Sequence, residues 1–243
     1  MSLLDSYLPA PDLRGVTQAQ SLPNEGCIGF AARLAAEDRA VLIAGRRVET
    51  FEVGATVWHP GSDSVTLLTG GTAATMAALP DGLEAGSAIH AAGDVPGLGE
   101  ALVGHSSIER GVALTPATAI RLSATTVKRL WRDSGGFRDA AVAQMTAEAA
   151  SARRWCACQS RHGVDERVAG LLSRLAQHVE GNTIKTTQEA AAQVLGIQRT
   201  TVSQSASKLQ HVGVLQWRRG SVDILDASRL NRFACGCGIA EDL

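Results

Sequence analysis

The spacing of apolar residues divides the chain into a β-rich first half and a helical second half. Apolar residues recur at helical intervals between Phe30 and Leu42, which predicts helix there. Residues 48–122 carry short apolar runs separated by Gly and Pro, a pattern typical of a small antiparallel barrel or sandwich. The Ala-rich segment 72–80 has no decisive period. The runs expected to be strands are Val48–Val53, Thr56–Trp58, Val65–Leu68, Ala88–Ala91 and Val112–Ile120.

From Ala124 onward the apolar period becomes helical. Thr125–Trp131 is expected to be a short helix, ended by Ser134-Gly135-Gly136. A second amphipathic helix is expected from Val164 to Leu175, followed by a loop from His178 to Lys185. Between them lies a long helical run from Phe137 to His162, and its Ala-rich stripe should pack against another helix. The stripe consists of Phe137, Ala140, Ala141, Met145, Ala149, Ala152 and Trp155 or Cys156.

Two short helices joined by a glycine are predicted in residues 186–215. Thr186 or Thr187 is a good N-cap for a helix over Gln188–Leu195. Gly196 can adopt the left-handed conformation of a tight turn before a second helix, Gln198–His211. The outward side of that second helix carries short hydrogen-bonding groups with an arginine at its start, as suits a DNA major groove. Its members are Arg199, Thr200, Ser203, Gln204 and Ser207.

A basic hairpin is expected after these helices. Val214–Trp217 and Val222–Leu225 form its strands, and its turn carries Arg218 and Arg219, which can lie along phosphates. The net charge of the chain is −1, yet residues 185–232 hold seven Lys/Arg against three Asp/Glu. A basic module on a mildly acidic body favours a polyanionic partner. The alternative is an ordinary helical hairpin followed by a strand pair.

These motifs resemble the Crp/Fnr family of bacterial transcription regulators. Thr187-Gln188-Glu189, the run from Leu195 to Ser203 and the Gly213–Asp226 hairpin carry the most specific part of the resemblance. Cys158-Gln159-x-x-His162-x-Val164-x-x-Arg167 is similar to the family's junction between its dimer helix and its DNA-binding domain. The glycine turns in Phe51–Gly61 and Ala92–Leu98 are similar to those of its cyclic-nucleotide-binding-like β-roll.

The resemblance implies an α+β fold. It would comprise an N-terminal antiparallel β-roll (a double-stranded β-helix), a long central dimerisation helix and a C-terminal winged helix-turn-helix. The corresponding segments are an arm over residues 1–24, the roll over 25–123, the dimerisation region over 124–162, the DNA-binding domain over 163–232 and a tail over 233–243.

The family's function then implies a homodimer that binds a palindromic operator in double-stranded DNA and contacts RNA polymerase, and that is not an enzyme. Arg199 would read a guanine, while Thr187 and Gln188 would hold phosphates. Thr200 and Gln204 stand where the family often has Glu and Arg, so a different half-site is expected. The DNA-binding set is Thr187, Gln188, Arg199, Thr200, Thr201, Ser203, Gln204, Lys208, Arg218 and Arg219, and the dimer set is Phe137, Ala141, Met145, Ala149 and Ala152.

An effector site is suggested by the same resemblance. Members that bind cyclic nucleotide have a Gly-Glu pair followed by an Arg, and Gly99-Glu100 and Arg110 have that spacing. The Glu would take the ribose hydroxyl and the Arg the phosphate of a cyclic nucleotide or another small effector. The alternative is a degenerate roll with Glu100 and Arg110 on its surface.

The five cysteines, Cys27, Cys156, Cys158, Cys235 and Cys237, include two Cys-x-Cys pairs. A one-residue gap is shorter than the usual zinc spacing, and in a helix Cys156 and Cys158 would point about 200° apart. Reduced thiols without a metal are therefore expected. A redox or metal sensor that uses both pairs is the alternative.

A further alternative is a cupin-like enzyme in the roll, tethered to DNA, although the sequence lacks a His-x-His, Ser/His/Asp or phosphate-loop motif. The longest uncharged run, residues 64–80, is too short and too polar to span a bilayer. No membrane association is expected. The N-terminus lacks a secretory pattern, so the expected location is the cytoplasm.

Overall fold

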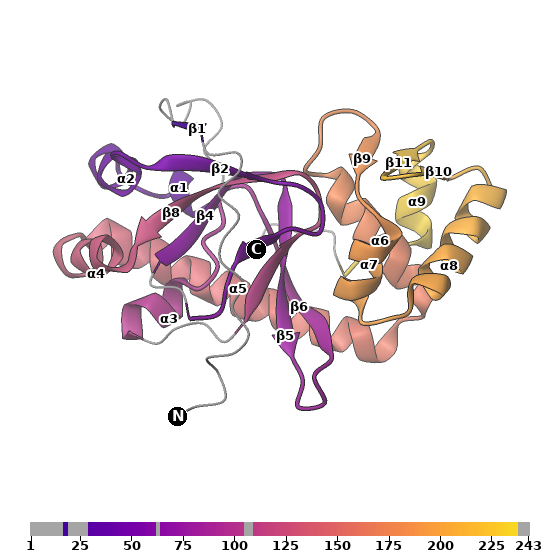
Figure 1. Cartoon of the computed structure of the whole chain (residues 1–243), viewed down its shortest axis with the longest axis horizontal. Helices are drawn as coiled ribbons and strands as arrows, with labels where there is room; N and C mark the ends of the chain where they lie inside the picture. The colour runs from indigo at the N-terminus through magenta and orange to yellow at the C-terminus, as the bar shows by residue number, and fades with distance from the viewer. Residues whose placement is uncertain (1–16, 19–28, 62–63, 105–108, 238–243) are drawn as a thin grey trace.

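The computed structural model describes residues 17–18, 29–61, 64–104 and 109–237. Its N-terminal part is an antiparallel β-roll of two facing sheets (Figure 1). One sheet has the order β1 (Thr17–Gln18), β2 (Arg47–Phe51), β8 (Ala117–Ser123), β4 (Ser64–Gly70). The other has the order β3 (Thr56–Trp58), β7 (Arg110–Ala113), β5 (Thr72–Ala78), β6 (Glu84–Ala91). The expected α+β class with an N-terminal roll is confirmed.

Three strand assignments differ from the sequence expectation, and one of them is β6, which begins at Glu84 instead of Ala88. The run Val112–Ile120 is two strands, because Pro116 lies between β7 and β8 and cannot donate to a sheet. The unassigned segment 72–80 contains β5, which pairs with both β6 and β7. Five consecutive β5 residues are buried, so this central strand shows no polar alternation. Burial on both faces is why the sequence of this segment shows no clear period.

Short helices cover the roll. They are α1 (Gly29–Ala32), α2 (Ala36–Ile43), α3 (Leu98–Val103) and α4 (Ala124–Asp133). The long helix α5 (Gly135–Arg161) follows directly. Ser134 ends α4 as expected, but Gly135 and Gly136 form the first turn of α5 instead of a break. The reason is an N-cap, since the Ser134 hydroxyl accepts a hydrogen bond from the Phe137 backbone N–H at 3.1 Å.

The two ends of the Ala-rich stripe of α5 contact the same chain, whereas Ala149 between them is exposed. Phe137 and Ala141 are fully buried, and the Phe137 ring lies edge-on to Phe30 with centroids 5.5 Å apart. At the other end, the Trp155 indole N–H donates to the Gly86 carbonyl oxygen at 2.6 Å. Phe137 and Ala141, which were predicted for a seam between two chains, are thus covered within the protomer itself.

The C-terminal part is a winged helix-turn-helix. It contains α6 (Val164–Ala176), α7 (Gln188–Leu195), α8 (Arg199–His211), α9 (Ala227–Phe233) and a sheet of order β10 (Leu215–Arg218), β11 (Ser221–Ile224), β9 (Thr183–Lys185). The expected loop over His178–Lys185 thus includes a strand, since Ile184 is buried against the helices and pairs with Val222. The α9 helix has no counterpart among the elements expected from the sequence.

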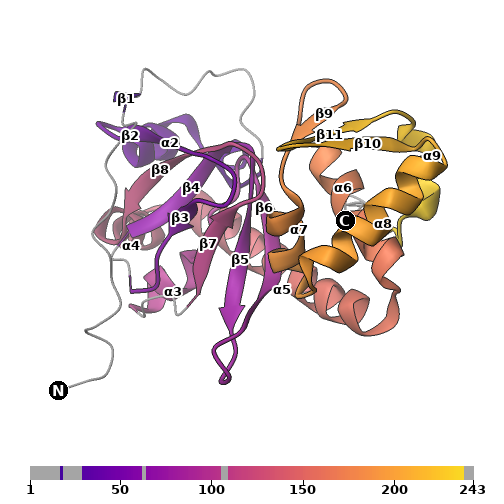
Figure 2. The same ribbon diagram turned by 45° about the vertical axis from the view of Figure 1, so that its right-hand side comes forward.

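The two parts dock through β6 and α7, which lie side by side in Figure 2. Ile89 of the roll shares one apolar cluster with Leu172 and Val194 of the C-terminal part. Arg174 of α6 donates to the Ile89 carbonyl oxygen at 2.6 Å. No helix among the described residues has the length and apolar character needed to cross a membrane. The core therefore continues from the roll into the helix-turn-helix.

Candidate nucleic-acid interface

The turn between α7 and α8 is formed by local signals in the sequence. The Thr187 hydroxyl caps α7 by accepting from the Ala190 backbone N–H at 3.0 Å. Gly196 ends α7 with φ +61°, the left-handed conformation that favours glycine. The α8 helix begins at Arg199, one residue after the expected Gln198. Both expected helices are thus present, with the expected turn between them.

The two sides of α8 differ in chemistry. Its inner side packs Val202, Ala206 and Leu209 into the core, and each is at most 4% exposed. The outer side presents the polar residues predicted for base reading. Arg199, Thr200, Gln204 and Ser207 are exposed, and Thr201 and Ser203 are half-buried. The structure thus brings the predicted α8 set together on one accessible surface.

Lys208, the last predicted α8 contact, already has an acidic partner. Its Nζ lies 2.6 Å from Oδ2 of Asp165 on α6, and the Ser205 hydroxyl also donates to that carboxylate. The hydrogen bonds from Lys208 and Ser205 lower the pKa of Asp165. Because both partners of the ion pair are largely exposed, the pair is weak. A DNA phosphate would therefore have to displace Asp165 in order to bind Lys208. No local sequence pattern indicates that Asp165 is the partner of Lys208.

The wing is a tight hairpin with a basic tip. Arg218 pairs with Ser221, and Arg219-Gly220 form the two-residue turn, with Gly220 at φ +81°. The strands lie at Leu215–Arg218 and Ser221–Ile224, so each expected strand shifts by one residue towards the turn. Nε of Arg218 lies 2.8 Å from Oδ2 of Asp223. Arg219 is exposed at the tip, and no ion pair of Arg219 is found in the described part of the chain.

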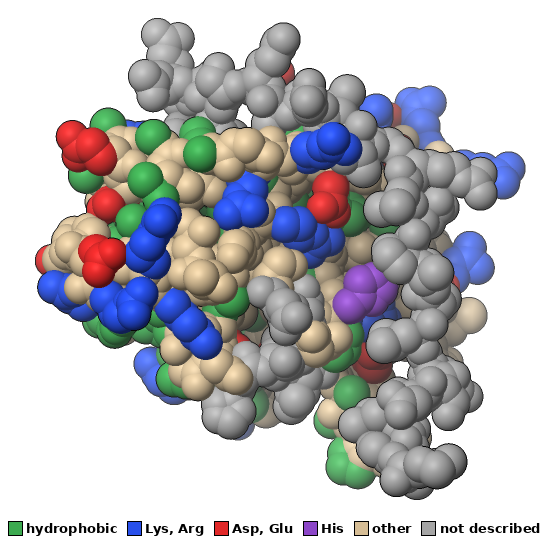
Figure 3. Space-filling view, turned by 60° about the vertical axis from the view of Figure 1, so that its left-hand side comes forward, with side chains coloured by type: hydrophobic (Ala, Val, Ile, Leu, Met, Phe, Trp, Pro, Cys, Tyr) green, Lys and Arg blue, Asp and Glu red, His purple; other side chains and the backbone are tan. Residues whose placement is uncertain are grey.

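Positive charge is not confined to the helix-turn-helix. Figure 3 turns the α2 and α4 side of the roll forward, and there Lys and Arg side chains outnumber Asp and Glu. The α4 helix alone contributes Lys128, Arg129 and Arg132. Charge by itself therefore does not single out one surface of this chain as a candidate nucleic-acid interface.

Of the predicted effector residues, Arg110 is paired with an acidic residue that the sequence did not indicate. Both carboxylate oxygens of Glu84 on β6 accept from Nε of Arg110, at 2.9 and 3.0 Å. Glu100 lies exposed on α3 and belongs to an acidic group with Glu109 and Glu148. Burial, reinforced by Glu100, Asp94 and Glu109, raises the pKa of Glu148 to about 7. The Arg110 guanidinium is thus already neutralised by Glu84.

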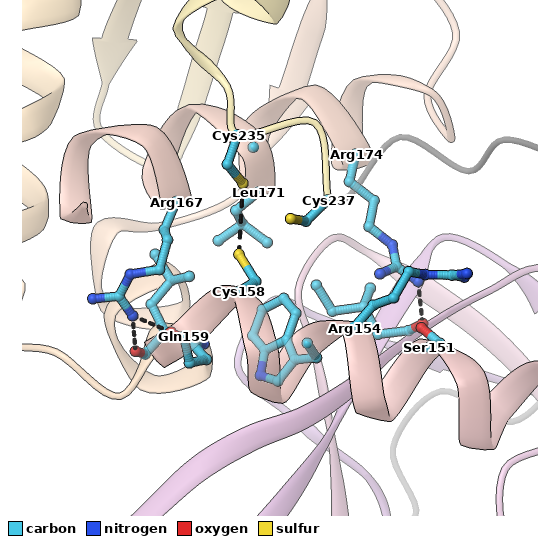
Figure 4. A pocket seen from close by; sticks show the side chains of 13 residues that line it. Ser151, Arg154, Cys158, Gln159, Arg167, Leu171, Arg174, Cys235 and Cys237 are labelled. Carbon is cyan, nitrogen blue, oxygen red and sulfur yellow. Dashed lines mark hydrogen bonds between the residues drawn. The ribbon is translucent and has the colours of Figure 1, made fainter. Parts of the chain in front are cut away.

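The four described cysteines do not gather as two Cys-x-Cys pairs. Cys156 is exposed on α5, while Cys158 is buried on the opposite side of the helix, as the helical geometry predicts. Figure 4 shows Cys158 facing Cys235 and Cys237, which follow α9. Burial and the neighbouring thiols raise the pKa of Cys158 to about 12. Cys27, at the start of the predicted roll segment, and the predicted N-terminal arm over residues 1–24, apart from β1, lie outside the described residues.

Comparison with known proteins supports this assignment. Residues 166–233 match the family model of the Crp-like helix-turn-helix domain. No curated protein sequence matches the chain. Three solved structures have the same fold over most of their length. The first is FixK2 from Bradyrhizobium japonicum, with 18% sequence identity and a TM-score of 0.66, where the match covers 78% of this chain and 98% of FixK2. The second is TTHB099, a CRP-family transcriptional regulator from Thermus thermophilus, with 21% identity and a TM-score of 0.64, covering 76% of this chain and 96% of TTHB099. The third is CLP, a c-di-GMP-responsive global regulator from Xanthomonas campestris, with 17% identity and a TM-score of 0.62, covering 78% of this chain and 99% of CLP.

The domain match covers α6 to α9, and the structural matches cover the roll and the long helix as well. The chain therefore carries a Crp-like helix-turn-helix domain within the fold of the Crp/Fnr-family transcriptional regulators.

Proposed function

We propose that this protein is a homodimeric transcription regulator that binds a palindromic site in double-stranded DNA. The observation that carries the proposal is the outer side of α8, where Arg199, Thr200 and Gln204 are exposed at the start of a well-packed recognition helix. The N-terminal residues of such a helix contact base edges in the major groove. The comparisons support this role, since the matched domain and the structural relatives are those of regulators rather than enzymes.

Each predicted contact then has a distinct task. The Arg199 guanidinium can donate to O6 and N7 of one guanine, and Thr200, Thr201, Ser203 and Gln204 lie beside it for neighbouring bases or phosphates. Thr187 and Gln188 lie at the N-terminus of α7, where free backbone N–H groups favour a phosphate. Three basic residues, Lys208, Arg218 and Arg219, would contact the DNA backbone only.

The dimer would form through the outward face of α5. Exposed residues on that face follow the alternating four- and three-residue spacing of a coiled-coil seam. Val142 is 50% exposed, which is unusual for an aliphatic side chain on a helix whose other face is buried. Ala149 belongs to this seam and to the predicted dimer set, whereas Met145 and Ala152 are half-buried towards the same chain. The seam consists of Val142, Thr146, Ala149, Arg153 and Cys156.

The roll would act mainly as a scaffold that holds α7. This role is supported by the Glu84–Arg110 ion pair, which already neutralises the predicted phosphate ligand in the described conformation. CLP is described as responsive to c-di-GMP, so control by a nucleotide remains a separate hypothesis for this chain. RNA polymerase as a partner and the cytoplasm as the location rest on the family resemblance.

The experiment that tests the function is selection of bound duplexes from a random pool by the purified full-length chain. The proposal predicts a two-fold symmetric consensus with half-site centres about 10 base pairs apart, one helical turn. A dimer with its two α8 helices in successive major grooves requires this spacing. Recovery of no consensus, or of an asymmetric single site, would contradict the proposal.

A further inference from the structure

Four metal-binding side chains converge where α5 meets the segment after α9. One ligand atom from each of Cys158, His162, Cys235 and Cys237 can be chosen so that all four lie within 4.8 Å of one another. The Sγ atoms of Cys158 and Cys235 are 3.5 Å apart, and Sγ of Cys237 is 3.5 Å from Nδ1 of His162. In Figure 4 the three sulfurs point towards one another between the helices.

Local structure directs each pair towards the same point. Cys158 and His162 are four residues apart at the end of α5, so they share one helix face. Gly236 has φ +71°, and no atom outside its neighbours lies within 4 Å of a Cβ built on it. Its conformation therefore turns the backbone between Cys235 and Cys237, so that a one-residue gap brings both thiols to one side.

The second pair is fixed against α6. The Cys235 backbone N–H donates to the Glu166 carbonyl oxygen at 3.3 Å. A Cβ on Gly170 would lie 3.2 Å from Sγ of Cys235, so the absent side chain leaves room for the thiol. Cys156 takes no part, since it is exposed on the other side of α5. The ligand set is thus three thiols and one imidazole, instead of two Cys-x-Cys pairs.

The spacing matches one tetrahedral zinc ion. Zn–S bonds of roughly 2.3 Å and a Zn–N bond of roughly 2.0–2.1 Å place two sulfurs about 3.8 Å apart, and a sulfur about 3.6 Å from the nitrogen. The two observed separations of 3.5 Å lie close to these values. In an iron–sulfur cluster the cysteine thiolates bind different iron atoms. Their sulfur atoms therefore lie further apart than the ligand atoms around a single tetrahedral ion.

We propose that Cys158, His162, Cys235 and Cys237 bind one Zn²⁺ in a closed structural site. Four protein ligands leave no open position for a substrate, as in other structural zinc sites. The ion would join the end of α5 to the residues that follow α9, some 77 positions later. It would thereby fix the helix-turn-helix domain relative to α5. If α5 is also the dimer helix proposed above, zinc would set the distance between the two α8 helices.

The first test is metal content by mass spectrometry of the full-length protein purified with zinc in the medium. The expected result is one zinc per chain in the wild type and in Cys156→Ser, the matched control. Less than about a tenth of that amount of zinc is expected in the Cys158→Ser variant. The same low amount is expected in a double variant that carries both Cys235→Ser and Cys237→Ser. Equal zinc in Cys158→Ser and Cys156→Ser, or no zinc in the wild type after reconstitution, would overturn the proposal.

A second measurement avoids variants that fail to fold. Wild-type protein stripped of metal and titrated with Co²⁺ should take up one equivalent, with the visible bands of tetrahedral cobalt and a near-ultraviolet thiolate-to-cobalt transition. An octahedral spectrum, iron–sulfur absorbance in the purified protein, or a Cys158–Cys235 disulfide found by mass mapping would each overturn it. Because neither readout uses DNA, failure of the zinc site and failure of the proposed function are distinguishable.

Discussion

Gly86 on β6 and Val194 on α7 bring the roll and the helix-turn-helix into direct contact. A Cβ added to Gly86 would lie 2.4 Å from Cγ2 of Val194 and 2.5 Å from its carbonyl oxygen. Neither distance is tolerated in a folded protein, so only glycine allows β6 and α7 to approach this closely. The Trp155 indole donates to the carbonyl oxygen of the same glycine, which adds α5 to the contact.

Gly86→Ala should therefore loosen this docking. Overpacking at a buried contact costs about 1–3 kcal/mol, and here the Val194 backbone cannot move out of the way as a flexible side chain would. The expected result in urea unfolding is a lower midpoint. Gly135→Ala is the control, since the nearest atom to its added Cβ is 3.7 Å away on a flexible arginine. A variant as stable as the control would show that the close approach is not maintained in solution.

The stability of the protein should depend on pH through Glu148. Its pKa is raised to about 7 by burial and by Glu100, Asp94 and Glu109, against 4.5 when unfolded. The stabilising, protonated form is thus fully present below pH 4.5 and is lost as the pH rises through 7. Glutamine mimics that form, so Glu148→Gln should exceed the wild type in stability by on the order of 3 kcal/mol at pH 8.

Urea unfolding at pH 5 and pH 8 measures this effect. His90 lies 3.8 Å from Glu148 and is buried, and burial lowers its pKa to about 4, so it stays uncharged across this range. The advantage of Glu148→Gln should shrink to about 1 kcal/mol or less at pH 5, which lies only just above the unfolded pKa of 4.5. The exposed Glu189→Gln should show no such dependence. An advantage that is the same at both pH values would refute the assignment to Glu148.

Cyclic nucleotides should not stabilise the wild type. The Arg110 guanidinium is held by Glu84, so an incoming phosphate must displace that carboxylate. Thermal unfolding with millimolar cyclic AMP, cyclic GMP or c-di-GMP should show no shift in the melting temperature. A saturable shift that Arg110→Ala abolishes would instead establish a nucleotide site at Arg110.

A charge on the outward face of α5 should dissociate the dimer without unfolding the chain. Val142 is half exposed in the protomer, so Val142→Glu buries a charge only when two chains pair. Light scattering should report a monomer with an unchanged helical circular dichroism spectrum. Ala147→Glu, exposed but off the seam, should leave the dimer intact. If Val142→Glu stays dimeric, α5 does not pair through this face.

Local signals made the helix-turn-helix predictable. Thr187, Gly196 and the polar side of α8 act within a few residues of one another, so the sequence pattern determines them. Contacts between residues far apart in the sequence could not be predicted from such local patterns. Phe137, Ala140 and Ala141 of the stripe are buried, but periodicity does not say whether the covering surface belongs to the same chain or to another.

The cysteine cluster shows the same limit. Helical geometry correctly separated Cys156 from Cys158, but the contact between Cys158 and Cys235 depends on how α6 and α9 pack. A signal was nevertheless present in the sequence, because Cys158 and His162 have the spacing of one helix face. Similarly, nothing local indicates that Arg110 pairs with Glu84, which the β-roll brings across from another strand.

Salt dependence should separate the wing from α8. Arg218 and Arg219 lie on a turn that reaches only backbone, so replacing both with Ala should weaken all duplexes about equally. The slope of log affinity against log salt should fall by up to about 0.9 for each phosphate that a subunit no longer neutralises. Titrations at several salt concentrations measure the slope. An unchanged slope would show that the wing does not touch phosphates.

The most direct test of the central claim is a binding titration of Arg199→Ala on two duplexes, one selected by the wild type and one scrambled. Arg199 lies exposed at the start of α8, and its contact with a guanine is worth about 1–3 kcal/mol of discrimination. The account predicts a loss of about 5- to 150-fold per contacted half-site on the selected duplex, relaxed preference at one base pair in each half-site, and little change on the scrambled one. Equal losses on both duplexes would contradict the assignment of α8 as the recognition helix.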